Sequence, residues 1–174
     1  MGYYISISNG QICIDRSNLP RFFSLVKVLM DARNIEENGN GGSYADGVKK
    51  ESWYSWIHTD RVREAAKNYD LIGVFAEWGY KITHTSTMNE LDFYDVAIEQ
   101  GDTKIGDEEV FFSAIAPAIA DGSQIDVKGE DDARWRWYWE DGKFFTQDAD
   151  DVRIIYGTAH EVKFHNVVPE TENV

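Results

Sequence analysis

The chain has 174 residues and a formal net charge of −14, with 43% hydrophobic and 14% aromatic residues. This length suits one domain with a substantial core, and the hydrophobic content excludes a disordered chain. The negative charge disfavours direct binding to nucleic acid or to an anionic membrane surface, because like charges repel.

Cys13 is the only cysteine, which excludes an intrachain disulfide and a cysteine-based zinc site. The first residues lack the basic and apolar regions of a signal peptide. No stretch approaches the ~20 apolar residues that cross a bilayer. We therefore expect a cytoplasmic protein without membrane contacts.

The first predicted element is a β-hairpin over residues 4–15. Its turn is Asn9-Gly10, the strongest short hairpin signal. A turn at this point places the isoleucines of both strands on one face, which we expect to be the core face. These isoleucines are Ile5, Ile7, Ile12 and Ile14.

A helix over residues 19–33 is predicted next, with Asn18 as its N-cap. Residues 34–44 are rich in glycine and asparagine, and we expect the loosest, most flexible loop of the chain there. Two further helices are predicted over residues 59–68 and 71–78, because apolar residues recur at helical spacing.

Two strands are predicted over residues 80–85 and 90–98. A helix over residues 106–120 follows, with Asp107 as its N-cap. Pro117 lies inside this helix and should kink it, since proline has no N–H group to donate.

The last third of the sequence predicts a β-meander. Its expected strands cover residues 124–128, 134–140, 143–147, 152–156 and 161–167. Asp141-Gly142 is a second two-residue turn signal, and it pairs Trp139 with Phe144. Alternation then places Trp135, Trp137 and Trp139 on the face that packs under the helices.

The order of these elements predicts an α+β fold. We expect one domain over residues 1–168, with a mostly antiparallel sheet and about three helices packed on one face. Residues 169–174 are expected to form a C-terminal tail.

Three segments of the chain resemble a family of small proteins found in bacteriophages and bacteria, especially in actinobacteria and their phages. The segments are MGYYISI, WYSWIHTD and AIAPAIADGSQIDVKGEDDARWRWYWEDGK. The resemblance covers most of residues 1–145 and implies a phage or mobile-element origin, hence a host-cell cytoplasm. It implies no activity and transfers no functional residue. Asp131-Asp132-Ala133 replaces the Asp-Gly of the family pattern, so we expect a wider turn here.

No nucleophile elbow or phosphate-binding loop occurs in the sequence, and we expect no cofactor. Two histidine arrangements are compatible in principle with a metal ion, but neither has an established ligand spacing. They are His84 with Asp92 or Asp95, and His160 with His165 and Glu161. A metal-dependent enzyme built from clustered carboxylates and a histidine is therefore one alternative function.

Two acidic turns and one aromatic cluster are the candidate sites for a binding partner. The acidic residues are Glu130, Asp131 and Asp132 in one turn, and Asp148, Asp150 and Asp151 in the other. The aromatic residues are Trp53, Tyr54 and Trp56, which suit either a core element or an interface anchor.

The leading hypothesis is an acidic, non-enzymatic binding protein that engages a basic, nucleic-acid-binding host protein. One form of it is an inhibitor of host defence that mimics the charge of DNA. A further alternative is an assembly protein that forms homo-oligomers through the aromatic cluster.

Overall fold

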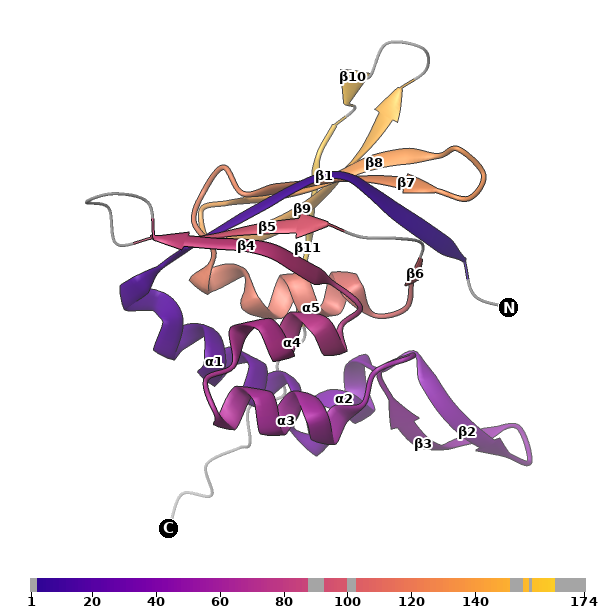
Figure 1. Cartoon of the computed structure of the whole chain (residues 1–174). Coiled ribbons are helices and arrows are strands. Elements are labelled where there is room, and N and C mark those ends of the chain that lie inside the picture. Colours follow the sequence, from indigo (N-terminus) through magenta and orange to yellow (C-terminus); the bar gives the residue numbers. More distant parts are fainter. Residues whose placement is uncertain (1–2, 88–92, 100–102, 151–154, 157, 165–174) are drawn as a thin grey trace.

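The molecule has two layers, with one antiparallel sheet and the helices on one of its faces (Figure 1). The computed structural model describes residues 3–87, 93–99, 103–150, 155–156 and 158–164. The strands of this sheet are β1 (Tyr4–Asp15), β4 (Lys81–Thr87), β5 (Phe93–Glu99), β6 (Thr103–Lys104), β7 (Gln124–Gly129), β8 (Arg134–Glu140), β9 (Lys143–Asp150), β10 (Ile155–Tyr156) and β11 (His160–Val162). The helices are α1 (Leu19–Leu29), α2 (Ala32–Asn38), α3 (Thr59–Lys67), α4 (Leu71–Glu77) and α5 (Glu108–Ile115), with short 3-10 helices η1 (Arg16–Asn18) and η2 (Ala116–Ala118).

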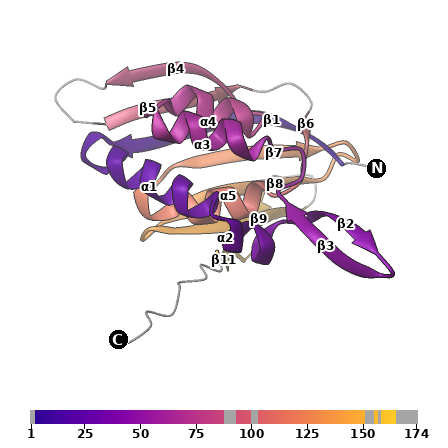
Figure 2. The ribbon, with the colours of Figure 1, turned by 90° about the horizontal axis from the view of Figure 1, so that it is seen from below.

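The strand order is β10-β9-β8-β7-β1-β5-β4, with β6 added to β1 and β11 added to β9. A second sheet of two strands, β2 (Gly41–Ala45) and β3 (Val48–Trp53), projects from the body as an arm (Figures 1 and 2). The predicted α+β class is confirmed, with five α-helices among the described residues rather than about three. The predicted tail, residues 169–174, lies outside the described residues.

β1 is one continuous strand, so the predicted hairpin at Asn9-Gly10 is wrong. The first half of β1 pairs with β7 and the second half with β5, and the register with β7 shifts between Ile7 and Asn9. Such a β-bulge adds one residue, which reverses the side-chain alternation along the strand. The isoleucines on both sides of the bulge therefore still reach the core. Ile5, Ile12 and Ile14 are buried, and Ile7 is partly buried.

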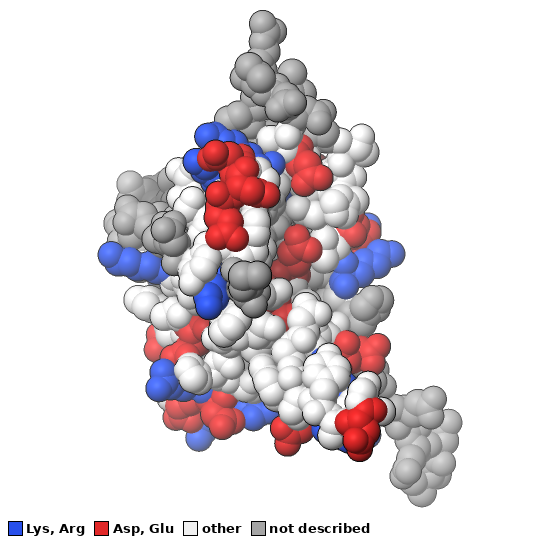
Figure 3. Space-filling view, turned by 90° about the vertical axis from the view of Figure 1, so that its right-hand side faces the viewer, with Lys and Arg blue, Asp and Glu red and all other residues white. Residues whose placement is uncertain are grey.

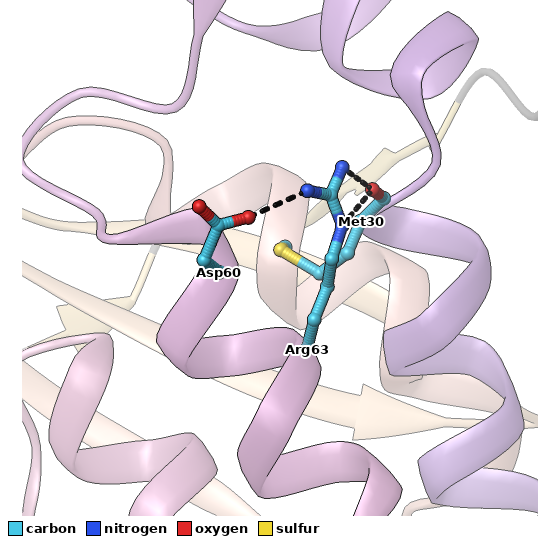
Figure 4. Close-up of polar contacts among 3 residues, drawn as sticks. All are labelled: Met30, Asp60 and Arg63. Carbon is cyan, nitrogen blue, oxygen red and sulfur yellow. Dashed lines mark hydrogen bonds and ion pairs between the residues drawn. The ribbon is translucent and has the colours of Figure 1, made fainter.

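The predicted helix over residues 19–33 is two helices, because α1 ends at Leu29 and α2 begins after Asp31. The break is held by Arg63 of α3 (Figure 4). Its Nε and Nη2 donate to the carbonyl oxygen of Met30 at 3.1 and 2.8 Å, and its Nη1 donates to Asp60 at 2.9 Å. A carbonyl freed at the end of α1 thus gains a charged donor from another helix.

The arm replaces the loop that was predicted over residues 34–44. Its turn residues, Asp46 and Gly47, are both left-handed (φ 53° and 75°), as a two-residue hairpin turn requires. The preceding glycines serve close packing: a Cβ at Gly39 would lie 2.7 Å from a backbone oxygen of Trp53, and a Cβ at Gly41 would overlap the Trp53 indole. These glycines let neighbouring segments approach closely. Their role is therefore close packing and not the chain flexibility that the sequence predicted.

The tryptophan-rich meander forms in the predicted register. Trp139 pairs with Phe144 across a turn whose residues, Asp141 and Gly142, are both left-handed (φ 52° and 66°). Trp137 and Trp139 are fully buried and Trp135 is half-buried. The alternation thus places the tryptophans toward the helices, as expected.

Phe112 of α5 is the centre of the aromatic core between the layers. Its ring centroid lies 5.2–5.8 Å from those of Tyr80, Phe111, Trp137, Trp139 and Phe144. α5 then continues as the 3-10 helix η2, in which Pro117 lies and the N–H of Ala116 bonds to Ser113 O. The α-helix is therefore shorter than the predicted residues 106–120, and a 3-10 helix stands at Pro117 in place of the predicted kink.

Candidate functional site

The first acidic cluster forms the exposed turn between β7 and β8, which we call the acidic turn (Glu130, Asp131 and Asp132). Asp131 accepts a hydrogen bond from the Tyr3 hydroxyl, which lowers the pKa of Asp131. Asp132 pairs with Lys128 at 2.6 Å, and this contact lowers the pKa of Asp132. Both carboxylates are therefore ionised and locally partnered at neutral pH.

The second acidic cluster is described only in part. Asp148 is exposed and lies opposite Trp135, at the same end of β8 as the acidic turn. The Asp150 side chain and all of Asp151 lie outside what the structure describes. On the face shown in Figure 3, acidic side chains form separate patches, several with basic side chains beside them. This face does not present one continuous negative surface.

The structure divides the predicted aromatic cluster. Tyr54 is fully buried, and its hydroxyl donates to the carbonyl oxygens of Leu29 and Asn34 at 3.0 and 3.2 Å. Trp53 and Trp56 are exposed, at 41% and 61% of their surface. The tyrosine is thus a core residue, whereas the two tryptophans lie at the surface.

Asp107 ties the arm to α5. Its Oδ1 accepts from the backbone N–H and the side-chain amide of Asn40 at 3.1 and 2.6 Å, and its Oδ2 accepts from the backbone N–H of Ser55 at 2.6 Å. Asp107 occupies the N-cap position of α5, as expected, but makes no side-chain capping bond there. Burial raises the pKa of Asp107, and the hydrogen bonds from Ser55 and Asn40 oppose this. The carboxylate therefore positions the turn that carries Trp56.

Trp56 and Tyr4 flank one ammonium group, and we call these two residues the ring pair. The Nζ of Lys104 lies 4.5 Å from the centroid of the Trp56 ring and 5.5 Å from that of Tyr4. Tyr4 is 41% exposed, so both rings are open to solvent on one side. Aromatic faces attract cations at such distances through the negative charge of the π-system.

The ring pair and the acidic turn are neighbours. Tyr3 bonds to Asp131 through its hydroxyl, and the Tyr4 carbonyl accepts from the N–H of Glu130 at 3.0 Å. A depression of about 450 Å³ lies between Tyr4 of the ring pair and the acidic turn, and its lining includes Tyr4, Lys128, Glu130 and Asp132. Two of the predicted partner-binding features therefore share one surface, although they are more than 70 positions apart in the sequence.

The part of the chain that the structure describes contains no set of ligands for the predicted metal site. No group of three or more histidine, cysteine or acidic side chains could hold an ion there. His160 and Glu161 are exposed on β11, while Asp92 and His165 lie outside the described residues.

Sequence reasoning missed Tyr4 and Lys104 at the ring pair, and the exposed residues Tyr44 and Val48 of the arm. The Asp46-Gly47 dipeptide between short β-prone runs was the available signal for the arm. Nothing in the sequence indicated that Tyr4 and Trp56 would meet at Lys104.

Comparisons with protein-family models, with curated proteins and with solved structures found no match to this chain. Among the described residues, no helix is long and apolar enough to cross a membrane.

Proposed function

We propose that this protein is a non-enzymatic binding protein whose partner carries a basic surface. The observation that carries this proposal is the contact between the Tyr3-Tyr4 segment and the acidic turn, which joins exposed aromatic rings to ionised carboxylates. Protein interfaces commonly combine a few aromatic anchors with a polar rim. The aromatic rings supply buried area, and the carboxylates supply attraction and orientation toward a basic partner.

The net charge of −14 supports a partner that normally binds nucleic acid, because such proteins carry basic surfaces. An inhibitor of host defence is one specific form of this proposal, and the sequence resemblance supports only its encoding by a phage or mobile element. The separate acidic patches in Figure 3 favour a local contact over mimicry of a long stretch of DNA.

Matched charge variants test the proposal. The pair E130Q/D132N removes two carboxylates from the acidic turn, and E36Q/E37Q removes two exposed carboxylates from α2. The immobilised variants are exposed to cell lysate, and each retained protein is purified and titrated against them over a salt series. We expect the retained proteins to be basic. At low salt they should bind E130Q/D132N about 5- to 10-fold more weakly than they bind E36Q/E37Q.

Equal weakening in both double variants would show that only total charge matters. An affinity that changes neither with salt concentration nor with the E130Q/D132N substitutions would overturn the proposal.

Self-association through the arm is a second candidate, because the arm lacks the negative excess of the whole chain. Residues 41–53 hold two lysines, one aspartate and one glutamate, and thus have no net charge. Tyr44 and Val48 near its turn are 66% and 56% exposed. Light scattering distinguishes this alternative: a dimer that Y44S/V48S converts to a monomer supports it, and a monomeric wild-type protein excludes it.

A further inference from the structure

We propose that the ring pair is a cation-binding site, which takes an arginine or lysine side chain of the partner and which Lys104 occupies in the free protein. The inference rests on the proposed function and deepens it, since it names the chemical group that the surface recognises. The chain itself shows that the site holds a cation, because one ammonium lies over both rings.

The geometry of the site suits a cation on a flexible side chain. Lys104 and Tyr4 are directly opposite in the pairing of β6 with β1, and Trp56 approaches from the turn that follows the arm. Both rings keep solvent-exposed surface, so an incoming group can reach them. A guanidinium is planar, stacks on aromatic faces and is more weakly hydrated than an ammonium, so arginine should compete well with Lys104.

The backbone that carries the Trp56 ring is fixed before any partner binds. Its backbone is left-handed (φ 66°), a conformation that is strained for a bulky residue. The Ser55 N–H bond to Asp107 fixes the preceding peptide. Gly106 allows the close approach, because a Cβ there would lie 2.9 Å from Ser55 and 3.3 Å from the indole. A preordered anchor loses less conformational entropy on binding.

The surrounding charge favours a cationic ligand of more than one residue. The depression beside Tyr4 is bordered by Lys128, Glu130 and Asp132, and because the Asp132 carboxylate is paired with Lys128, Glu130 supplies the negative excess of this lining. A basic peptide with one side chain between the rings can therefore place its neighbours along the acidic turn. An acidic peptide would meet the same carboxylates with like charge.

The test follows the indole N–H resonance of Trp56 by NMR in isotope-labelled full-length protein, with W56F to assign it. The protein is titrated with hexa-arginine amide, hexa-lysine amide and tetramethylammonium chloride. We expect hexa-arginine to shift the Trp56 resonance saturably and more strongly than hexa-lysine. K104M should bind about 3-fold more tightly than K50M, which loses the same charge from the exposed face of the arm.

Removal of the anchor provides the converse test. W56L in the K104M background should weaken hexa-arginine binding about 5-fold. W53L is the control, because Trp53 is also exposed but makes no ring contact with Lys104 among the described interactions.

The outcomes separate the two proposals. Salt-dependent peptide binding that leaves the Trp56 resonance unmoved, or K104M binding no more tightly than K50M, overturns the cation site and leaves the proposed function standing. A saturable Trp56 shift with hexa-arginine, when no basic protein is retained from lysate, overturns the proposed function and supports the cation site.

Discussion

Asp107 accepts a hydrogen bond from the backbone N–H of Ser55 at 2.6 Å, across 52 positions of the chain. The same carboxylate binds Asn40 at the start of the arm, so one buried side chain fixes both ends of the segment between them. A buried carboxylate can be stable only with such donors, because burial alone disfavours its charge. The position of Trp56 thus depends on the burial of Asp107.

The substitution D107N should destabilise the protein by about 1–3 kcal/mol, because an amide cannot accept as many hydrogen bonds and loses their charge-assisted strength. Urea unfolding measures the change. D121N, at an exposed aspartate, should change stability by less than about 0.5 kcal/mol. Equal stability of D107N and D121N would contradict this role of Asp107.

Glu108 should make stability pH-dependent. Burial raises its pKa from 4.5 to about 7 in the folded protein. Between pH 4.5 and about 7, Glu108 is protonated in the folded state and ionised in the unfolded state. The free energy of unfolding therefore falls as pH rises through this window, and it no longer changes with Glu108 above it. The ionised carboxylate costs about 3 kcal/mol, from 1.36 kcal/mol per pKa unit.

Unfolding of wild type and E108Q across this window measures the effect. E108Q cannot ionise, so its stability relative to wild type should rise with pH between the two values. Parallel curves for the two proteins would rule out a raised pKa at Glu108.

Arg63 should be irreplaceable by lysine at the break between α1 and α2. R63A is expected to cost about 1–2 kcal/mol, since the Met30 carbonyl loses its charged donors. R63K should recover less than half, because a single ammonium cannot reproduce the fork of the guanidinium. R61A removes only an exposed pair at 3.8 Å with Glu77 and should be nearly neutral. Full rescue by R63K would show that charge alone matters.

Asp132 has a left-handed backbone (φ 65°), a conformation that glycine adopts more readily than other residues. D132G and D132A both lose the pair with Lys128, so they differ in backbone conformation alone. D132G should unfold at the higher urea concentration, because glycine adopts this conformation without steric cost. The backbone of Asp131 is not left-handed, so D131A should be more stable than D131G. The same order at both positions would refute the argument.

Local signals predicted elements correctly where no competing tertiary contact existed. The helix predicted over residues 71–78 forms as α4, and the structure adds a cap from Asp70 to the N–H of Gly73 at 2.8 Å and a left-handed Gly79 (φ 83°) at its end. Asp141-Gly142 forms its turn between strands that both belong to the meander. Asn9-Gly10 carries an equally strong signal but does not turn, because β7 and β5 supply partners for an extended β1. These partners come from sequence more than 80 positions away, which a local pattern does not contain.

The binding surface was predictable only in its parts. Exposure of the acidic turn follows from the charge and turn pattern of residues 129–133. The ring pair depends on Tyr4, Trp56 and Lys104, which lie in three distant segments. Tyr54 and Trp56, two positions apart, face opposite environments, because the left-handed backbone at Trp56 breaks the alternation. No periodicity in the sequence reveals such a reversal.

The long β1 has a consequence for how the chain folds. Ser6 pairs with Lys128, so 122 positions separate two residues of the central ladder. Contacts of this separation form slowly, since a large loop must close before they contribute free energy. The local hairpin of β8 and β9 can form first, whereas β1 must wait for β7 and β5. The first strand of the sheet in chain order is thus among the last to reach its place in it.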